Sequence, residues 1–201
     1  MARYTGPKRK LSRREGTPLF AKDVSYFERK GTVPLGQQRT SRGRRRVSEY
    51  GIQLREKQKA KRMYGILERQ FSRYYQTASK KRGNRGEVLL QLLETRLDNV
   101  AYRLGFSPSR AGARQLVSHG HVSVDNKKVT IPSFQVKAGS TVAILDKMLD
   151  NTQVRKSLES QQTLPGWLER KAAVGKVLRV PTREEMEPGI SEQLIVEYYS
   201  R

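Results

Sequence analysis

The spacing of apolar residues changes from a helical period to an alternating period within residues 94–145, which limits this segment to two short helices followed by a β-hairpin. In the first helix the apolar residues follow the spacing i, i+3, i+4 and i+7, which is that of a core-facing stripe. They are Leu97, Val100, Ala101 and Leu104. Gly105 then supplies the kind of residue that commonly ends a helix.

The second helix begins at one of two serines. Ser109, or Ser107 with Pro108 as the first helical residue, can accept a hydrogen bond from the free N–H groups at a helix start. Beyond this helix apolar and polar residues alternate, and Asp125-Asn126 is typical of a tight turn. We expect a further strand over residues 141–145.

Arginines lie along the edges of both expected helices. Arg110 and Arg114 are one turn apart, about 40° from each other around the helix, so both guanidinium groups can reach the same ligand surface. Arg96, Asn99 and Arg103 share the polar face of the first helix. The helices, the hairpin and the arginines together predict a compact RNA-reading module.

The charge of the chain is large and unevenly distributed. Forty-one Lys and Arg against nineteen Asp and Glu give a net charge of +22, of which residues 1–86 carry +19. A surface of this density repels itself unless a polyanion neutralises it, so nucleic acid is the expected partner. No apolar run long enough for a membrane span and no signal-peptide apolar region is present, and we expect a cytoplasmic protein. The lack of cysteine excludes disulfides and thiolate metal sites.

Residues 1–46 are rich in cations, and their apolar residues are too scattered to pack a core of their own. The densest run, residues 39–46, suits phosphate contact because guanidinium forks bind phosphate oxygens in pairs and Gly43 lets the backbone come close. Two interpretations are open, a solvated disordered tail and an arm that becomes ordered against RNA. The charge favours RNA, so we expect an arm that is flexible alone and protected in the RNA complex.

A helix capped by Ser48 follows, and Gly65 is expected to break it. Arg55, Lys59 and Arg62 are spaced i, i+4 and i+7 and form a basic stripe along this helix.

Beyond the break, aromatic and apolar residues recur at helical spacing from Leu67 to Ala78. Such a series can stack on bases, but at this period packing in a core is more common. Arg69 and Arg73 then face outward one turn apart, and residues 80–86 form a basic linker where a domain boundary would fall.

The residues that follow the module are expected to form short elements. We interpret Trp167, the one tryptophan, as an anchor in a local apolar cluster rather than a base-stacking residue. Thr182 and Glu185 have the spacing of a capping box for a short helix. The final segment from Ser191 fits a helix, although the β-branched pair Ile195-Val196 leaves a strand open.

Candidate catalytic chemistry is weak throughout. Glu184, Glu185 and Glu187 lie in a short polar helix and are interpreted as a solvated face. His119 and His121 lack the further ligands that a zinc site needs. Phosphate-binding glycine loops, dinucleotide turns and serine elbows are all missing from the sequence. We therefore expect no enzyme, no cofactor and no metal.

The module contains the runs Arg96-Leu97-Asp98-Asn99-Val100, Tyr102-Arg103-Leu104-Gly105-Phe106 and Ala113-Arg114-Gln115-Leu116-Val117-Ser118-His119-Gly120. These runs resemble the RNA-binding domain named after the bacterial small-subunit ribosomal protein S-four. The flanks resemble the same ribosomal family, from Met1-Ala2-Arg3-Tyr4 to the ending Leu194-Ile195-Val196-Glu197-Tyr198-Tyr199-Ser200-Arg201. Some members carry four zinc-binding cysteines in the arm, and this chain resembles a cysteine-free variant.

The resemblance implies an α+β fold in which a helical domain holds an inserted RNA-binding domain of two helices and a small antiparallel sheet, preceded by an extended basic arm. The implied limits are 1–46 for the arm, 47–86 plus 182–201 for the helical domain and 87–181 for the insert, with the module at about 94–145. Pseudouridine synthases and tyrosyl-tRNA synthetases carry the same module beside a catalytic domain, and a small stress protein consists of the module alone. The residues outside the module are too few here for a catalytic domain, which disfavours an enzyme of this kind. The long flanks that match the ribosomal family disfavour the stress protein.

The resemblance also implies a structural constituent of the small ribosomal subunit that binds 16S ribosomal RNA, nucleates assembly of its 5′ domain and contributes to translational accuracy. It implies contact with ribosomal protein S-five and other small-subunit proteins, and a place near the mRNA entry channel; some members repress their own mRNA. The candidate RNA-binding residues are Arg3, Lys8, Arg9, Lys10, Arg13, Arg14, Arg42, Arg44, Arg45, Arg46, Arg55, Lys59, Arg62, Arg69, Arg73, Arg96, Arg103, Arg110, Arg114 and His119.

Overall fold

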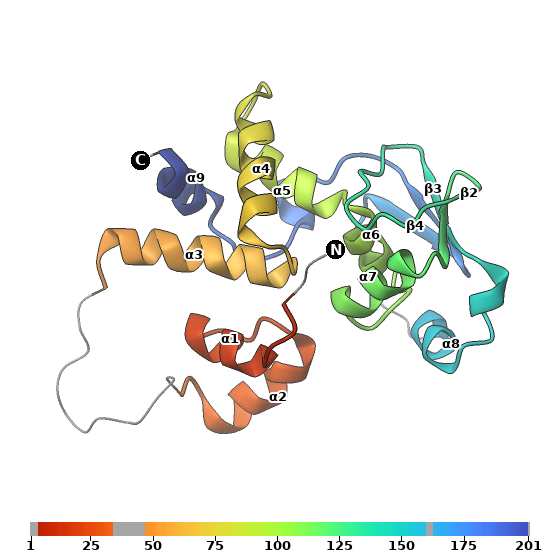
Figure 1. The fold of residues 1–201 in the computed structure, drawn as a ribbon, viewed down its shortest axis with the longest axis horizontal. Coiled ribbons are helices and arrows are strands. Elements are labelled where there is room, and N and C mark those ends of the chain that lie inside the picture. Colours follow the sequence, from red (N-terminus) through yellow and green to blue (C-terminus); the bar gives the residue numbers. More distant parts are fainter. Residues whose placement is uncertain (1–3, 34–46, 160–162, 201) are drawn as a thin grey trace. The chain divides into compact units, whose positions relative to one another are not determined.

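The computed structural model describes residues 4–33, 47–159 and 163–200 (Figure 1). The chain divides into two compact units, Met1–Gln76 with Gly189–Arg201, and Thr77–Pro188. Helices make up the first unit, whereas the second combines helices with a sheet. Among the described residues, no helix combines the length and the apolar character needed to cross a membrane.

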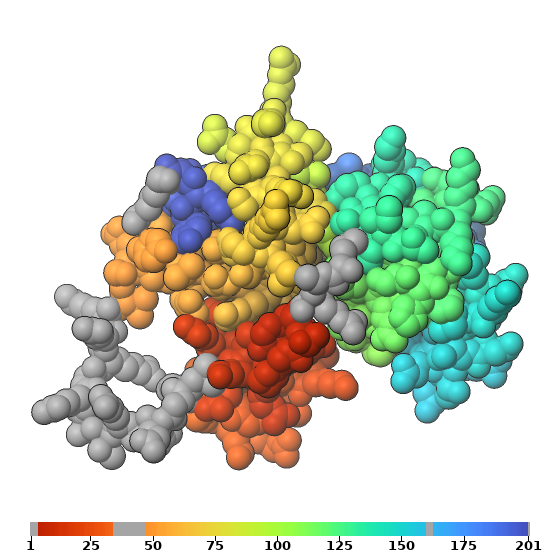
Figure 2. Space-filling view, in the orientation of Figure 1, coloured from red at the N-terminus to blue at the C-terminus, as the bar shows by residue number. Residues whose placement is uncertain are grey.

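In the first unit, the C-terminal helix packs beside a long helix from the first third of the chain. The helices of this unit are α1 (Lys8–Glu15), α2 (Ala21–Lys30), α3 (Glu49–Met63), α4 (Glu68–Ser79, whose last three residues belong to the second unit) and α9 (Glu192–Ser200). Side chains of α9 (blue) and α3 (orange) meet in the space-filling view (Figure 2). The final segment is therefore a helix and not a strand.

The predicted start and break of α3 are confirmed. The Ser48 side chain accepts a hydrogen bond from Gly51 N at 3.2 Å and so caps the helix. Gly65 follows the helix end with a φ of 65°, a left-handed conformation that glycine adopts at little cost. Most of the aromatic and apolar series beyond it packs as predicted, because Phe71 and Ala78 are fully buried and the Tyr75 and Tyr199 rings stack with centroids 4.5 Å apart, but Leu67 at its start is exposed.

Within the N-terminal arm, residues 4–33 contain two helices where we expected an extended chain. A buried polar link joins them, because Ser12 Oγ donates a hydrogen bond to Asp23 Oδ2 and also accepts one from Leu19 N. Leu19 is buried beside this link. The resemblance implied the extended chain, and the scarcity of apolar residues favoured a flexible one, but a contact that satisfies polar groups inside the segment also orders it.

The second unit is an α+β arrangement, so the predicted fold class is confirmed. Its helices α5 (Arg85–Glu94), α6 (Leu97–Arg103) and α7 (Arg110–Ser118) precede the sheet, and α6 and α7 lie against one face of it (Figure 1). The strands are β1 (Val122–Val124), β2 (Lys127–Lys128), β3 (Thr141–Ile144), β4 (Leu168–Lys171) and β5 (Val174–Val177), and the short helices are η1 (Asp146–Met148), α8 (Thr152–Glu159) and η2 (Arg183–Glu185). The order β2-β1-β3-β5-β4 is antiparallel throughout.

The core of the second unit contains the stripe predicted from the sequence. Its four apolar residues on and after α6, Leu97, Val100, Ala101 and Leu104, are all fully buried. Ser109, and not Ser107, caps α7 by accepting a hydrogen bond from Gly112 N. Trp167 is fully buried in the same core, as expected for an anchor. Gly175 of β5 lies so close to Leu104 that a methyl group at that position would overlap its side chain.

Candidate nucleic-acid interface

The candidate arginines Arg96, which precedes α6, Arg103 of α6, and Arg110 and Arg114 of α7 all bind carboxylates of the second unit. Arg96 forms a forked pair with Asp98, with Nε 3.0 Å from Oδ1 and Nη2 2.7 Å from Oδ2. Arg114 Nη1 donates to the same Asp98 Oδ2 at 3.0 Å. One aspartate of α6 therefore links an arginine at the start of its own helix to an arginine of α7.

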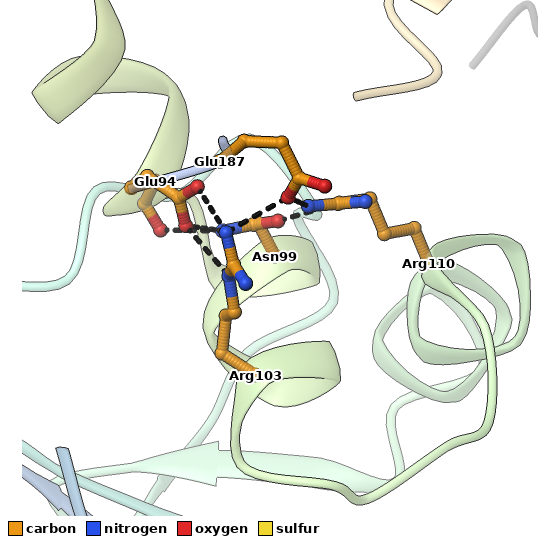
Figure 3. A network of polar contacts seen from close by, with 5 residues as sticks. All are labelled: Glu94, Asn99, Arg103, Arg110 and Glu187. Carbon is orange, nitrogen blue, oxygen red and sulfur yellow. Dashed lines mark hydrogen bonds and ion pairs between the residues drawn. The ribbon is translucent and has the colours of Figure 1, made fainter. Parts of the chain in front are cut away.

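The second cluster joins five side chains from four parts of the unit, namely α5, α6, α7 and the segment after η2 (Figure 3). Arg103 forms a fork with Glu94, with Nε 3.1 Å from Oε2 and Nη2 2.7 Å from Oε1, and the same Nη2 lies 2.8 Å from Glu187 Oε2. Arg110 Nη2 donates to this Glu187 oxygen as well. Asn99 bridges the two halves, because its Nδ2 donates to Glu94 Oε2 at 2.5 Å and its Oδ1 accepts from Arg110 Nε at 2.8 Å.

These arginines differ in how much of each side chain reaches the surface. Arg96 is 2% exposed, whereas Arg103, Arg110 and Arg114 keep 19%, 15% and 15% of their side-chain surface. The Arg110 guanidinium also lies 4.6 Å from the centre of the Tyr102 ring, a cation–π contact. Glu94, Asp98 and Glu187 are the carboxylates that form ion pairs with these four arginines. Arg103, Arg110 and Arg114 are thus fixed in orientation and partly accessible, which suits recognition of a polyanion.

The basic stripe of α3 makes contacts within the first unit. Arg55 and Arg62 both donate to Glu15 Oε1 at the end of α1, and Lys59 Nζ donates to Gly189 O. The Glu15 side chain is buried, and burial raises the pKa of its carboxyl although Arg62, Arg55 and Arg14 act in the opposite direction. The stripe therefore holds α1 against α3 and is not a uniformly solvated face.

Lys57 is a buried cation on α3 that was not among the residues predicted from the sequence. Its Nζ lies 4.4 Å from the centre of the Tyr198 ring and 2.8 Å from Glu68 Oε1. Burial alone would raise the pKa of Glu68, but hydrogen bonds from Lys57, Lys61 and Tyr199 outweigh it and lower this pKa to about 2. The cluster fastens α9 to α3 and α4.

The remaining candidates are spread over the surface of the described residues. Exposed positions on α1 and α4 hold Lys8, Arg9, Lys10, Arg14, Arg69 and Arg73, and Arg13 is half-buried with Nε 3.1 Å from Val33 O. His119 is exposed at the end of α7. Arg3, Arg42, Arg44, Arg45 and Arg46 lie outside the described residues. No cluster of three or more potential metal-binding side chains occurs in the part of the chain that the structure describes.

The carboxylates that organise the arginines were not predicted from the sequence. Glu187 was interpreted as solvated, yet it binds Arg103 and Arg110, which lie 84 and 77 residues away in the sequence. No local pattern can reveal a pair of this separation. Asp98 is different, since it lies only two residues after Arg96, and this short separation was a usable signal.

Known proteins are similar to this chain over its entire length. Residues 3–94 match the family model described as the ribosomal protein S4/S9 N-terminal domain, and residues 95–142 match the S4 domain model. Similar proteins include "Small ribosomal subunit protein uS4" of Dictyoglomus turgidum, 54% identical over 208 residues, and of Akkermansia muciniphila, 50% identical over 205 residues. "Small ribosomal subunit protein uS4A" of Symbiobacterium thermophilum is 49% identical over 209 residues. Each alignment covers 100% of both chains.

Proposed function

The chain belongs to the uS4 family of small ribosomal subunit proteins, and on this premise we propose that it binds 16S ribosomal RNA directly and nucleates assembly of the 5′ domain. The family is one of ribosomal structural proteins and not of enzymes. The proposal extends to cytoplasmic ribosomes, to an influence on translational accuracy, to contact with ribosomal protein S-five and with mRNA near its entry channel, and to repression of its own mRNA.

The observation that carries the proposal is the partly exposed set of Arg103, Arg110 and Arg114. Their guanidinium groups are held in place by carboxylates and by the Tyr102 ring, so little side-chain freedom is lost when a phosphate binds. Residues 1–86 carry a net charge of +19 in addition. Fixed guanidinium forks on a strongly basic protein favour a folded RNA as ligand.

The mechanism that we propose is electrostatic clamping of a folded RNA junction. RNA helices that meet at an angle bring their phosphates close together, and a basic protein surface offsets the repulsion between these phosphates. Because the bases of double-stranded RNA are poorly accessible, shape rather than base contact would select the junction. The domain limits inferred from the sequence, with residues 87–181 inserted in a helical domain, stay part of this proposal.

A binding titration tests the function. The protein is titrated against the isolated 5′ domain of 16S RNA and against an unrelated structured RNA of equal length, in parallel and over a series of salt concentrations. We expect tighter binding to the 5′ domain. We also expect the logarithm of the affinity to fall, for each tenfold rise in salt concentration, by about 0.7 to 0.9 per neutralised phosphate. Equal affinity for the two RNAs would leave a nonspecific RNA-binding protein and overturn the proposed role in assembly.

A further inference from the structure

Two arginines from different helices converge on one carboxylate oxygen. Arg103 at the end of α6 and Arg110 at the start of α7 both direct Nη2 at Glu187 Oε2, which Arg103 approaches to 2.8 Å (Figure 3). The other carboxylate of this cluster, Glu94, is fully buried and holds Arg103 through both Nε and Nη2. Glu187 is therefore the more exposed of the two carboxylates, and Glu94 still binds Arg103 without it.

Glu187 differs from Glu94 in its exposure, in its secondary structure and in its hydrogen bonds. Its side chain is 16% exposed, and it lies beyond η2 in a segment that is neither helix nor strand. Its hydrogen bonds with Arg103 and Arg110 are both made through Oε2. Glu94, by contrast, is the last residue of α5 and also binds Asn99. Glu187 is thus the carboxylate that can leave while the arginines stay in place.

The chemistry of the site fits an RNA phosphate as well as a carboxylate. A phosphodiester oxygen, like a carboxylate oxygen, accepts hydrogen bonds from guanidinium groups and carries negative charge. Glu94, Asn99 and Tyr102 would continue to orient Arg103 and Arg110 after an exchange. We propose that Glu187 is a placeholder for one backbone phosphate of the bound RNA, and that it leaves the two arginines when the RNA binds. This inference rests on the proposed function, since the ligand is the RNA.

The placeholder has a physical consequence for RNA selection. A phosphate must displace Glu187 before it contacts the two guanidinium groups. The binding free energy gained at this site is therefore smaller than it would be if no carboxylate occupied it. Weakly held, nonspecific RNA would be disfavoured, whereas an RNA fixed by many other contacts would still exchange. Glu187 would lower affinity and also keep the two cations neutralised in the free protein.

The test compares two glutamate variants of the full-length protein, Glu187→Gln and Glu184→Gln. Both changes remove one negative charge and lie three residues apart, but Glu184 is in η2, is exposed and has no ion pair in the described part of the chain. If Glu187 competes with phosphate, Glu187→Gln should bind 16S 5′-domain RNA about three- to fivefold more tightly than Glu184→Gln, the size of one partly exposed ion pair. Equal affinity of the two variants, or weaker binding by Glu187→Gln, would overturn the exchange.

A double-mutant cycle with Arg110→Gln gives a second readout. When the competitor is absent, Arg110 should contribute more to RNA affinity, so Arg110→Gln should cost more in the Glu187→Gln background than in the wild type. A smaller cost would identify Glu187 as a positioning residue and refute the placeholder. Melting temperatures check folding, and if Glu187→Gln is unstable the shorter Glu187→Asp, which should show a partial gain, replaces it.

The outcomes separate this inference from the proposed function. If the wild-type protein fails to prefer 16S 5′-domain RNA over the unrelated RNA, the proposed function fails, whatever the variants do. If the preference is present but the two glutamate variants behave alike, only the exchange fails. Inorganic phosphate, titrated against both variants and followed by melting temperature, shows whether the site takes a phosphate without the rest of the RNA. Stabilisation of Glu187→Gln but not of Glu184→Gln supports the site, and equal responses count against it.

Discussion

Lys57 Nζ lies 4.4 Å from the centre of the Tyr198 ring, and through this contact the C-terminal helix α9 is fastened to α3. Lys57 is 3% exposed and also pairs with Glu68. We expect Lys57→Ala to lower the free energy of unfolding by roughly 2–3 kcal/mol, because it removes a desolvated cation–π contact and a partly buried ion pair. Urea denaturation measures the effect. Lys61→Ala, which removes the more exposed partner of Glu68, should cost at most about 1 kcal/mol, and equal losses would contradict the role of the ring.

The low pKa of Glu68 predicts a dependence of stability on pH. This carboxyl has a folded-state pKa of about 2 against an ordinary value of 4.5, so its contribution is present above pH 4.5 and is lost as the pH falls toward 2. Because the side chain is 46% exposed, solvent screening limits the contribution to about 1 kcal/mol. Chemical denaturation from about pH 6 to about pH 2.5, which spans most of the interval between the two pKa values, should show a flatter profile for Glu68→Gln than for the wild type. Glu184→Gln is the control and should keep the wild-type slope.

Truncation of the buried leucines should act on RNA binding through the fold. Leu97 is fully buried and Leu116 is buried on α7, so Leu97→Ala and Leu116→Ala should each cost roughly 2–5 kcal/mol and lower the melting temperature. Leu67 is 41% exposed, and Leu67→Ala should cost less than about 1 kcal/mol. Loss of RNA binding with unchanged stability in the first two variants would show that these leucines are not core residues.

Joint replacement of Arg110 and Arg114 should weaken the salt dependence of RNA binding. If each arginine contacts one phosphate, the double glutamine variant should flatten the slope of log affinity against log salt by roughly two units. A matched control replaces Arg155 and Arg179, two more exposed, ion-paired arginines of the same unit, and should leave the slope near that of the wild type. An unchanged slope for the first variant with an intact fold would remove both residues from the interface.

Glu15 joins α1 to α3, and its removal should release the N-terminal helices. Glu15→Ala leaves Arg55 and Arg62 without their shared carboxylate, and we expect a cost of roughly 1–3 kcal/mol and faster trypsin cleavage within α1. Glu28→Ala, at an exposed position of α2, is the control and should not change the cleavage rate. Identical digestion patterns for the two variants would mean that α1 is held by other contacts.

The sequence by itself determined the local structure of the RNA-reading module. The apolar period of α6, the Ser109 cap and the Asp125-Asn126 turn all appear where they were predicted, with φ values of 48° and 63° at the turn. Each of these features depends on residues a few positions apart, whose backbone preferences and hydrogen bonds act within one turn of the chain. The anchoring role of the fully buried Trp167 could be inferred from its apolar surroundings in the sequence, whereas the fold class was predicted from the family resemblance.

Only the tertiary structure decided which charges meet. Arg103 and Arg110 reach Glu187 across 84 and 77 residues, and Arg55 and Arg62 reach Glu15 across 40 and 47. In the sequence these arginines form basic stripes, but in the folded chain their orientation and exposure depend on distant carboxylates. Coulomb attraction depends on separation in space, which chain packing sets and local periodicity does not encode. The basic character of the protein can therefore be read from its residues, whereas the geometry of its arginines exists only in the fold.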